Sequence, residues 1–270
     1  ERIPFGHVEA GLRTGDLDSP FPEEMNRVVA SQLTRWHFAP TGLAADRLLA
    51  EGHDGARVHV TGNTVIDALH HVAASAPDPG LGLDPARRVL LVTLHRRENF
   101  GAPLLRICDA LAALIRDNPD VQMVLPVHHN PNVREVIRAR FGKTGRAILC
   151  EPLDYATFVG AMQRATLILS DSGGVQEEAP SLGKPVLVLR DTTERPEAVM
   201  AGVTRLVGTA TETIRAAAQE LLDDPSAYAA MARHQSPYGD GAAAARIRAV
   251  LRRDLLGAAV PVPDWVQMAA

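Results

Sequence analysis

The chain has 270 residues, a length typical of one large domain or two modest ones. Its hydrophobic content of 46% is ordinary for a globular protein, and its net charge of −4 argues against a general nucleic-acid binder. No apolar run approaches the roughly 20 residues that cross a bilayer, so the composition also argues against a membrane protein.

The first residues of the chain and its two cysteines narrow the class of protein further. The sequence opens with Glu1 rather than methionine and enters motif-dense sequence at once, so we interpret it as a fragment that starts inside a domain. No basic-then-apolar signal segment opens it. Cys108 and Cys150 lack CxxC spacing, and two free thiols in a reducing cytoplasm are the simplest interpretation.

The part of the chain before a Pro- and Gly-rich linker at residues 77–82 contains few predicted elements. In chain order they are a strand at 3–8, a helix opening at Pro22, a strand at 36–39, a helix at 42–51, a strand at 58–60 and a helix at 65–76. Two or three strands are too few for a core of their own, so we expect this first domain to be incomplete.

The part after the linker repeats the strand–helix pattern more fully. Strands are predicted at 89–93, 121–125, 147–149, 165–169, 186–189 and 203–207, and helices at 103–117, 133–141, 155–164, 211–223, 226–234 and 242–256. Strands that alternate with helices of ten or more residues indicate a parallel sheet with crossover helices. The sequence therefore predicts a complete doubly wound α/β domain here.

The stretch from Asp171 to Ala179 follows a predicted strand with a Gly-rich turn and the start of a helix. Backbone N–H groups at a helix N-terminus bind anions, and a carboxylate just beyond the glycines can accept hydrogen bonds from a ribose diol. The same stretch is also consistent with a tight turn whose acidic residues suit the helix dipole. These residues alone leave the two interpretations evenly balanced.

Further polar clusters fall at the ends of predicted strands. They are His7/Glu9/Arg13, His95 to Glu98, His128/His129 and Arg190 to Glu197. The carboxyl ends of parallel strands gather at one edge of a sheet, where ligands bind. The histidines lack metal-ligand spacing, and no P-loop or Gly-x-Ser-x-Gly elbow occurs, so we expect no metal and no cofactor.

Glu23 and Arg27 are four residues apart on the helix that Pro22 opens, so we expect them to share a face. A solvated surface ion pair, which stabilises a protein by only a few tenths of a kcal/mol, is the alternative. The neighbouring His7/Glu9/Arg13 cluster favours a functional pair.

Nine motifs occur in the order found in the bacterial non-hydrolysing UDP-N-acetylglucosamine 2-epimerases, and the chain resembles that family from residue 1 to about 250. They are HVEAGLRTGD (7–16), PEEMNR (22–27), TGNTVID (61–67), HRREN (95–99), PVHHNP (126–131), DSGGVQEEAP (171–180), GKPVLV (183–188), ERPE (194–197) and PYGDG (237–241).

The resemblance implies a GT-B fold, which consists of two Rossmann-like doubly wound α/β domains with a nucleotide-sugar cleft between them, the first domain being incomplete here. It implies a first domain at 1–76, a UDP-binding domain at 77–236, a C-terminal helix at 237–257 that packs back on the first domain, and a tail at 258–270.

The implied reaction is the reversible C2 epimerisation of UDP-N-acetylglucosamine to UDP-N-acetylmannosamine, which feeds cell-surface polysaccharide synthesis. UDP leaves by elimination to give 2-acetamidoglucal and then adds back. By their motif positions, Glu9 and Glu23 match the family's acid/base carboxylates and Arg27 matches its paired cation. His95 matches the active-site histidine near the diphosphate.

The resemblance also implies the binding residues and partners. Ser172, Gly173 and Gly174 match the phosphate cradle, Glu178 matches the ribose acceptor, and Arg96 and His128 match positions near a second, allosteric UDP-N-acetylglucosamine. The family implies a cytoplasmic homodimer without nucleic-acid or membrane partners. Its members carry further N-terminal residues, including an Asp linked to proton transfer, so we expect no turnover from residues 1–270 alone.

Three other functions remain open from the sequence. A GT-B glycosyltransferase or a non-catalytic UDP-sugar binder would share the nucleotide cradle, and a hydrolysing epimerase would release free N-acetylmannosamine and UDP. The Glu9/Glu23/Arg27 cluster favours the epimerase, because a transferase needs an acceptor site instead.

Overall fold

The computed structural model of the chain describes residues 3–18, 20–233 and 236–258. Two compact units are present. Unit 1 takes its described residues from 1–71, 194–197 and 236–270, and unit 2 takes them from 72–193 and 198–235. The first boundary falls after residue 71, inside a helix, whereas the sequence predicts it after residue 76. Of the predicted tail, only residue 258 is described.

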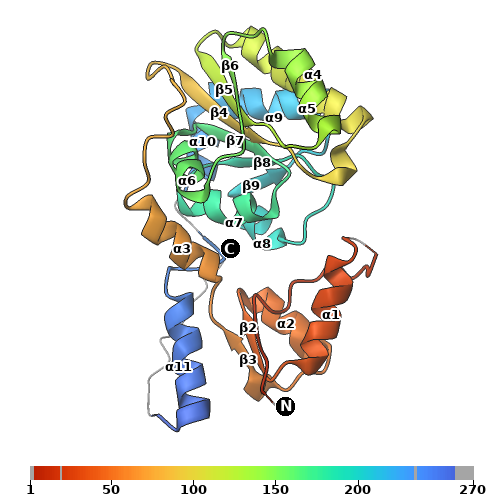
Figure 1. Ribbon diagram of the computed structural model, residues 1–270, viewed down its shortest axis with the longest axis vertical. Coiled ribbons are helices and arrows are strands. Elements are labelled where there is room, and N and C mark those ends of the chain that lie inside the picture. The colour runs from red at the N-terminus through yellow and green to blue at the C-terminus, as the bar shows by residue number, and fades with distance from the viewer. Residues whose placement is uncertain (1–2, 19, 234–235, 259–270) are drawn as a thin grey trace. The chain divides into compact units, whose positions relative to one another are not determined.

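Unit 2 is a doubly wound α/β domain on a parallel sheet with strand order β6-β5-β4-β7-β8-β9 (Figure 1). Its strands are β4 (Arg88–Thr93), β5 (Val121–Pro126), β6 (Ala147–Cys150), β7 (Leu167–Ser170), β8 (Val186–Val188) and β9 (Thr204–Leu206). The order reverses its direction between β4 and β7. In sheets of this kind, ligands bind outside the carboxyl ends of the strands at that reversal.

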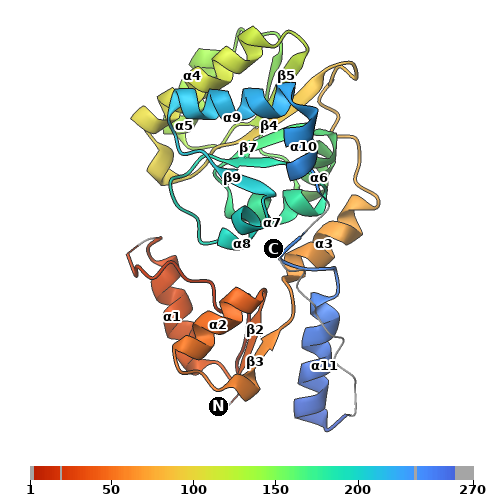
Figure 2. The ribbon, with the colours of Figure 1, turned by 180° about the vertical axis from the view of Figure 1, so that it is seen from behind.

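Helices cover both faces of this sheet, with α4, α5 and α9 on one face and α6 and α7 on the other (Figure 2). The helical segments are η2 (Arg97–Asn99), α4 (Ala102–Asp117), α5 (Pro131–Phe141), α6 (Tyr155–Arg164), α7 (Gly173–Ser181), α9 (Thr211–Asp223), α10 (Pro225–Met231) and α8 (Pro196–Met200), which crosses the boundary with unit 1.

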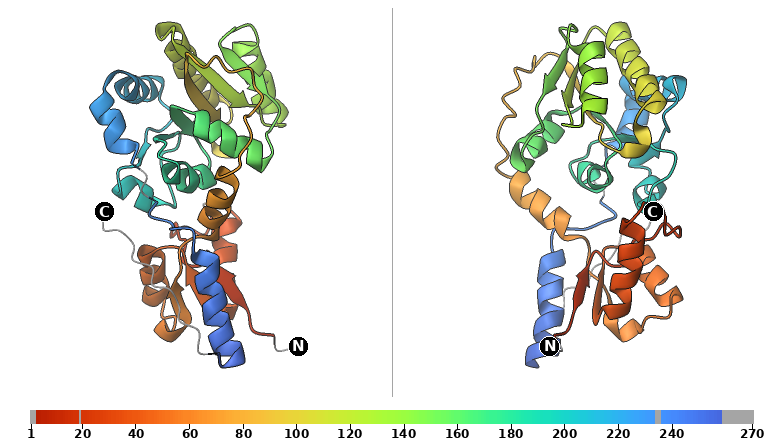
Figure 3. Two further views of the ribbon diagram at one scale, coloured as in Figure 1. Left: turned by 90° about the vertical axis from the view of Figure 1, so that its left-hand side faces the viewer. Right: turned by 45° about the vertical axis from the view of Figure 1, so that its right-hand side comes forward.

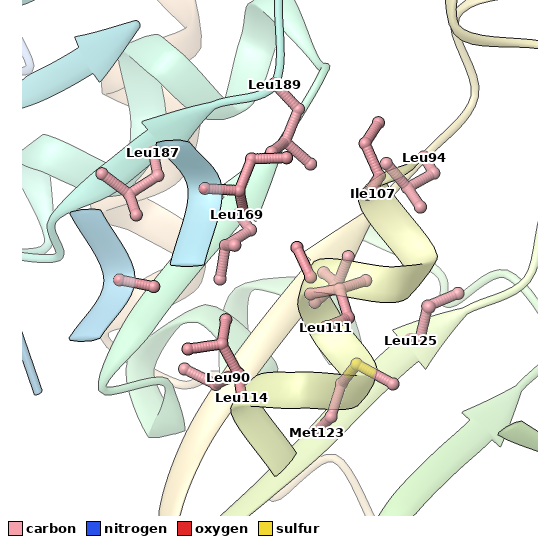
Figure 4. Packing of buried hydrophobic residues seen from close by; sticks show 14 of the residues in the cluster. Leu90, Leu94, Ile107, Leu111, Leu114, Met123, Leu125, Leu169, Leu187 and Leu189 are labelled. Atoms are coloured by element: carbon pink, nitrogen blue, oxygen red, sulfur yellow. The ribbon is translucent and has the colours of Figure 1, made fainter. Parts of the chain in front are cut away.

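The core of unit 2 shows why these segments fold as they do. Leu104, Ile107, Leu111 and Leu114 recur every three or four residues in α4, so they form one buried face. That face packs against strand side chains such as Met123 (Figure 4). Burial of one such side chain is worth about 1.5–3 kcal/mol, so the sheet is a firm support for the loops at its edge.

The predicted linker at residues 77–82 packs against its own unit. A Cβ atom at Gly160 in α6 would lie 2.2 Å from the carbonyl oxygen of Pro77. Gln163 Nε2 also donates a hydrogen bond to the Ala73 carbonyl oxygen at 3.0 Å. Glycine is therefore required at position 160, and the segment lies along α6.

Unit 1 is built on a parallel sheet with strand order β1-β2-β3 (Figure 3). Its elements are β1 (Gly6–Val8), α1 (Glu23–Leu33), β2 (Trp36–Ala39), α2 (Gly42–Ala50), η1 (Gly55–Arg57), β3 (Val58–Val60), α11 (Ala243–Leu256) and most of α3 (Thr64–Ala73). Leu48 of α2 packs on one side of the sheet, and Val250 of α11 packs against Trp36 and Phe38. Trp36 Nε1 donates to Asp254 Oδ2 at 2.7 Å.

Neither cysteine forms a disulfide bond. Cys108 is buried in α4, and burial raises the pKa of its thiol to about 12, so it packs as a small apolar group. Among the described residues, no helix has both the length and the apolar character needed to cross a membrane.

Candidate functional site

The ends of β4 and β7 are neighbours at the point where the strand order of unit 2 reverses. Thr93 and Ser170 are register partners, and their hydroxyl oxygens lie 2.6 Å apart. Beyond these residues the chain continues into His95 on one side and Asp171 on the other. Two sequence-predicted clusters therefore meet at the position where a sheet of this type binds its ligand.

Asp171 holds this meeting point together. Its carboxylate is fully buried. It accepts hydrogen bonds from the backbone N–H groups of His95 and Arg96, each at 3.0 Å, and from the side-chain amide of Asn99 at 3.1 Å. Its Oδ1 also lies 2.9 Å from Nδ1 of His95. A buried carboxylate needs such donors, so the loop after β4 is shaped around Asp171.

The ionisation of Asp171 determines how His95 is presented. Burial raises the pKa of Asp171, but the hydrogen bond and charge of His95, with the N–H groups of Arg96 and His95, lower it overall. The carboxylate is therefore ionised at neutral pH, and the hydrogen-bond network assigns a proton to Nδ1 of His95. The opposite nitrogen, Nε2, points away from Asp171 on a side chain that is 40% exposed.

Helix α7 begins two residues after Asp171, with Ser172 as its N-cap residue. The N–H of Ser172 donates to Ser170 Oγ at 2.9 Å, and Gln176 Nε2 donates to the Ser172 carbonyl oxygen at 3.0 Å. The first N–H groups of a helix have no intrahelical acceptor, and the helix dipole adds positive potential there. The predicted cradle Ser172 to Gly174 thus has the geometry of an anion site.

Glu178 lies one turn further along α7 and is buried. The Tyr155 hydroxyl donates to Glu178 Oε1 at 2.6 Å. Burial raises the pKa of Glu178, although the hydrogen bond from Tyr155 opposes this effect. A Cβ atom at Gly174 would lie 3.8 Å from Oε2, which places that second oxygen beside the anion site. Glu178 therefore offers an oriented acceptor for hydroxyl groups.

Arg96 and His128 are both neighbours of His95. Arg96 follows it in the chain, and the ring centroids of His95 and His128 are 6.4 Å apart. His128 is exposed, and its Nδ1 accepts a hydrogen bond from the Asn130 backbone N–H at 3.2 Å. The exposed His129 only approaches Glu151, at 3.6 Å.

Unit 1 carries the second cluster, centred on Glu9. This residue follows β1 directly and has a φ of +64°, a conformation that costs a non-glycine residue about 1–3 kcal/mol. At Gly11 a Cβ atom would lie 2.1 Å from the Ala44 carbonyl oxygen, so the chain is pressed against α2 there. Asn63 Nδ2 donates to Glu9 Oε1 at 3.0 Å, and Arg195 Nη2 lies 3.6 Å from the same oxygen.

Arg27 pairs with Glu24, not with Glu23, which corrects the expected pairing. The guanidinium group donates to Glu24 Oε2 at 2.8 and 3.1 Å, and Oε1 accepts from the backbone N–H of Thr14 at 2.8 Å. Burial raises the pKa of Glu24, but Arg27 and the loop N–H groups lower it overall. The Glu23 side chain is exposed, and within the described residues it makes no hydrogen bond or ion pair. The inward-facing acid takes the cation because it needs a partner.

The third member of the first predicted cluster, Arg13, is turned toward α1 and α2. It bonds Glu51 at 2.7 Å and Ser31 at 2.8 Å. Residues 194–197 are also held within unit 1, because Thr41 Oγ1 donates to Glu197 Oε1 at 2.6 Å.

Sequence reasoning assigned no role to several residues that hold the candidate site in place. They are Asn63, Glu24, Tyr155, Asp171 and Arg195. Most of these residues lie in the nine sequence motifs, next to a predicted site residue. Such a polar neighbour was the signal in the sequence that could have identified them. Tyr155 lies on another helix, and no spacing points to it. In the described part of the chain, no group of three or more His, Cys, Asp or Glu residues is placed to hold a metal ion.

The fold and this site together define the class. The chain is an α/β protein of the GT-B type with Rossmann-like parallel sheets, and its polar clusters lie at the strand ends that such proteins use for nucleotides. The chain belongs to the UDP-N-acetylglucosamine 2-epimerase family, whose model matches residues 1–252.

Named relatives agree with this assignment. The chain is 50% identical over 268 residues to the UDP-N-acetylglucosamine 2-epimerase of Escherichia coli (strain K12), covering 94% of this chain and 70% of that protein. It is similar to the S. aureus MnaA-UDP co-structure, with 44% identity, a TM-score of 0.92 and coverage of 98% and 73%. It is also similar to the UDP-GlcNAc 2-epimerase from Neisseria meningitidis bound to UDP-GlcNAc, with 44% identity, a TM-score of 0.87 and coverage of 95% and 71%.

Proposed function

We propose that this protein is a non-hydrolysing UDP-N-acetylglucosamine 2-epimerase that interconverts UDP-N-acetylglucosamine and UDP-N-acetylmannosamine. The observation that carries the proposal is the Glu9 carboxylate, which is bonded at one oxygen and 43% exposed in a member of this family. A carboxylate held in this way suits proton transfer at carbon. The ligands of the S. aureus and N. meningitidis relatives support UDP and its sugar as the substrate class.

In this proposal unit 2 holds the UDP group. The N–H groups of Gly173 and Gly174, with the hydroxyl of Ser172, bind the diphosphate, and His95 Nε2 supplies a further donor when protonated. Glu178 accepts the ribose hydroxyls through Oε2, since Oε1 already accepts from Tyr155. These contacts stabilise the charge that develops on UDP as it leaves.

Unit 1 performs the carbon chemistry. A carboxylate removes the C2 proton while the C1–O bond breaks, and UDP leaves with that electron pair to give 2-acetamidoglucal. In the return step a UDP oxygen attacks C1, and C2 takes a proton on its other face. We assign these proton transfers to Glu9 and Glu23, with Arg27 as the nearby cation. Arg27 Nη2 donates to Glu24 Oε2 at 2.8 Å, and this bond fixes the position of the Arg27 cation beside α1.

We also propose a second UDP-N-acetylglucosamine site at Arg96 and His128, and a homodimeric state. The position of both residues beside His95 supports the site, because a ligand there would contact the loop that Asp171 organises. Rates measured against UDP-N-acetylglucosamine concentration should be sigmoidal in the parent protein and hyperbolic in Arg96→Ala or His128→Ala. Light scattering of the protein in solution measures its oligomeric state.

The test of the reaction is turnover of UDP-N-acetylglucosamine in D2O by the full-length protein, which is the parent protein of all variants named here, followed by proton NMR. We expect the C2 proton signals of both UDP sugars to disappear as UDP-N-acetylmannosamine forms. Product that keeps its proton at C2 would rule out the elimination route. Free N-acetylmannosamine with stoichiometric UDP would assign a hydrolysing enzyme, and sugar transfer to an added acceptor would assign a glycosyltransferase. UDP binding, measured separately by calorimetry, tests the unit 2 contacts without turnover.

A further inference from the structure

The Glu9 carboxylate is held at one of its two oxygens. Oε1 accepts a hydrogen bond from Asn63 Nδ2 at 3.0 Å and lies 3.6 Å from Arg195 Nη2. Within the described residues, Oε2 makes no hydrogen bond, and the side chain is 43% exposed. One hydrogen bond and one ion pair therefore fix one oxygen, while the lone pairs of the other are open to a ligand.

Asn63 can present only its NH2 group to Glu9. Its Oδ1 accepts from the Val65 backbone N–H at 3.3 Å at the start of α3, and its own backbone N–H donates to the Tyr238 carbonyl oxygen at 2.6 Å. The residue is buried. An amide flip would lose both side-chain bonds, so the orientation of the amide is fixed by its surroundings.

Arg195 brings a cation to Glu9 from a segment that is distant in sequence. Its Nη1 donates to the buried Glu194 at 2.7 Å, and its carbonyl oxygen accepts from the Tyr238 hydroxyl at 3.2 Å. The Arg195 side chain is itself only 13% exposed. Both ends of the residue are therefore anchored, and the guanidinium group is held in place rather than free in solvent.

The backbone conformation of Glu9 also indicates that this carboxylate is held for a function. A φ of +64° persists at a glutamate only where the surroundings enforce it, and such residues gather at functional sites. Here the Ala10 N–H donates to the Phe38 carbonyl oxygen at 3.0 Å, which fixes the chain just after Glu9. The carboxylate is thus oriented by its backbone as well as by Asn63 and Arg195.

We propose that Asn63 and Arg195 are positioning residues that fix Oε1 of Glu9 and so direct Oε2 at C2 of the substrate; this rests on the proposed epimerase function. In the forward step the C2–H bond breaks and the proton moves to Oε2. The electron pair forms the C1–C2 double bond as UDP leaves with the C1–O pair. The new acid then releases its proton to solvent, while Arg195 keeps Oε1 in place. That release lets solvent deuterium enter.

The first test is Asn63→Ala, assayed by deuterium entry at C2 in D2O. We expect kcat to fall about 100-fold, because a misplacement of about 1 Å has that effect, while KM and UDP affinity stay within twofold. The conservative Asn63→Gln should restore part of kcat. Arg57→Met, which removes an exposed arginine that pairs with Asp54, is a surface control for both tests and should behave as the parent protein.

The second test concerns the charge of Arg195. Arg195→Met leaves the buried Glu194 without this cation and can unfold unit 1, so Glu194→Gln/Arg195→Met is tested beside it. We expect kcat in the double variant to fall about 10- to 100-fold while KM and UDP affinity stay within twofold, and Arg195→Lys to restore kcat in part. A residue with only a structural role would lower the folded fraction without separating kcat from KM.

The outcomes separate this proposal from the proposed function. If the parent protein exchanges deuterium at C2 and both Asn63→Ala and the double variant keep its kcat, the positioning role is overturned. If the parent protein forms product without any exchange at C2, the epimerase mechanism is overturned first. Loss of kcat with retained KM and UDP binding supports the assignment.

Discussion

The two polar clusters hold their central carboxylates in opposite ways. Asp171 in unit 2 is fully buried and accepts from two backbone N–H groups and two side chains. Glu9 in unit 1 is 43% exposed, and within the described part of the chain only its Oε1 has polar partners. A satisfied carboxylate can only hold its neighbours in place, whereas one with an open oxygen can exchange a proton. The contrast assigns support to Asp171 and chemistry to Glu9.

Glu9→Gln should give the largest effect. The amide cannot accept the C2 proton as a base, so deuterium exchange at C2 should fall about 1000-fold. UDP affinity should remain unchanged, because the nucleotide contacts lie in unit 2. NMR exchange and calorimetry with UDP measure the two quantities. Glu212→Gln on the exposed surface of α9 is the matched control. Normal turnover by Glu9→Gln would contradict the catalytic role of Glu9.

The stability of unit 1 should depend on pH through its buried histidines. Burial, together with His53, His7 and nearby arginines, lowers the pKa of His37 from 6.5 to about 4. Above pH 6.5 the folded and unfolded states are both neutral at this residue. Below it only the unfolded state binds the proton, so stability is lost as pH falls from 6.5 to about 4. The loss is on the order of 3 kcal/mol at most.

Trp36, buried beside His37 in β2, reports this transition. Urea unfolding of a Trp265→Phe background, followed by Trp36 fluorescence at several pH values, measures the free energy of unfolding. His37→Phe keeps a ring at this position without the titrating group, so its stability should vary less with pH. The pKa of His7 is also lowered by burial, Arg13 and Arg27, so some dependence should remain. An unchanged pH dependence in His37→Phe would contradict the assignment.

Much of the fold follows from the sequence, because local periodicity carries it. The helix predicted at 211–223 is α9 (Thr211–Asp223), and the apolar run at 121–125 is β5 (Val121–Pro126). Strand order is different, since pairing depends on contacts between distant segments. His95 and Asp171 are 76 residues apart, and only the order β5-β4-β7 brings them together.

The candidate site was predictable as a set of residues but not as a set of bonds. The choice between Glu23 and Glu24 shows the reason, because both lie within one turn of Arg27. The loop N–H groups of Thr14 and Gly15 select Glu24, and that loop has no periodicity to reveal its course. Which member of such a pair faces inward is decided by tertiary contacts.

Asp171→Asn tests the supporting half of the comparison. The variant keeps the side-chain shape, but its NH2 group cannot accept from His95 Nδ1 or from the N–H groups around it. We expect exchange at C2 to fall about 10- to 100-fold as His95 loses its orientation, with UDP affinity reduced as well. Asp109→Asn, which removes only a surface ion pair with Arg140, is the control. If Asp171→Asn lost kcat but bound UDP normally, Asp171 would act in the chemical step, as Glu9 does, and not as a support.

Tyr155→Phe should give the smallest effect and test how the nucleotide is held. It removes one hydrogen bond of 2.6 Å to Glu178 Oε1 and leaves the carboxylate itself in place. Burial raises the pKa of Glu178, and Tyr155 opposes that rise, so the variant should hold the proton of Glu178 more tightly. We expect UDP to bind about 5- to 10-fold more weakly, or about 1 kcal/mol, with a larger loss at lower pH.

Calorimetry with UDP and with 2′-deoxy-UDP separates the ribose contact from the phosphate contacts. If Glu178 accepts the ribose diol, the loss in the variant should be smaller for the deoxy ligand, which keeps only the 3′-hydroxyl. An equal loss for both ligands would show that Tyr155 supports α7 as a whole, and the division between a binding unit and a catalytic unit would then rest on the anion site alone.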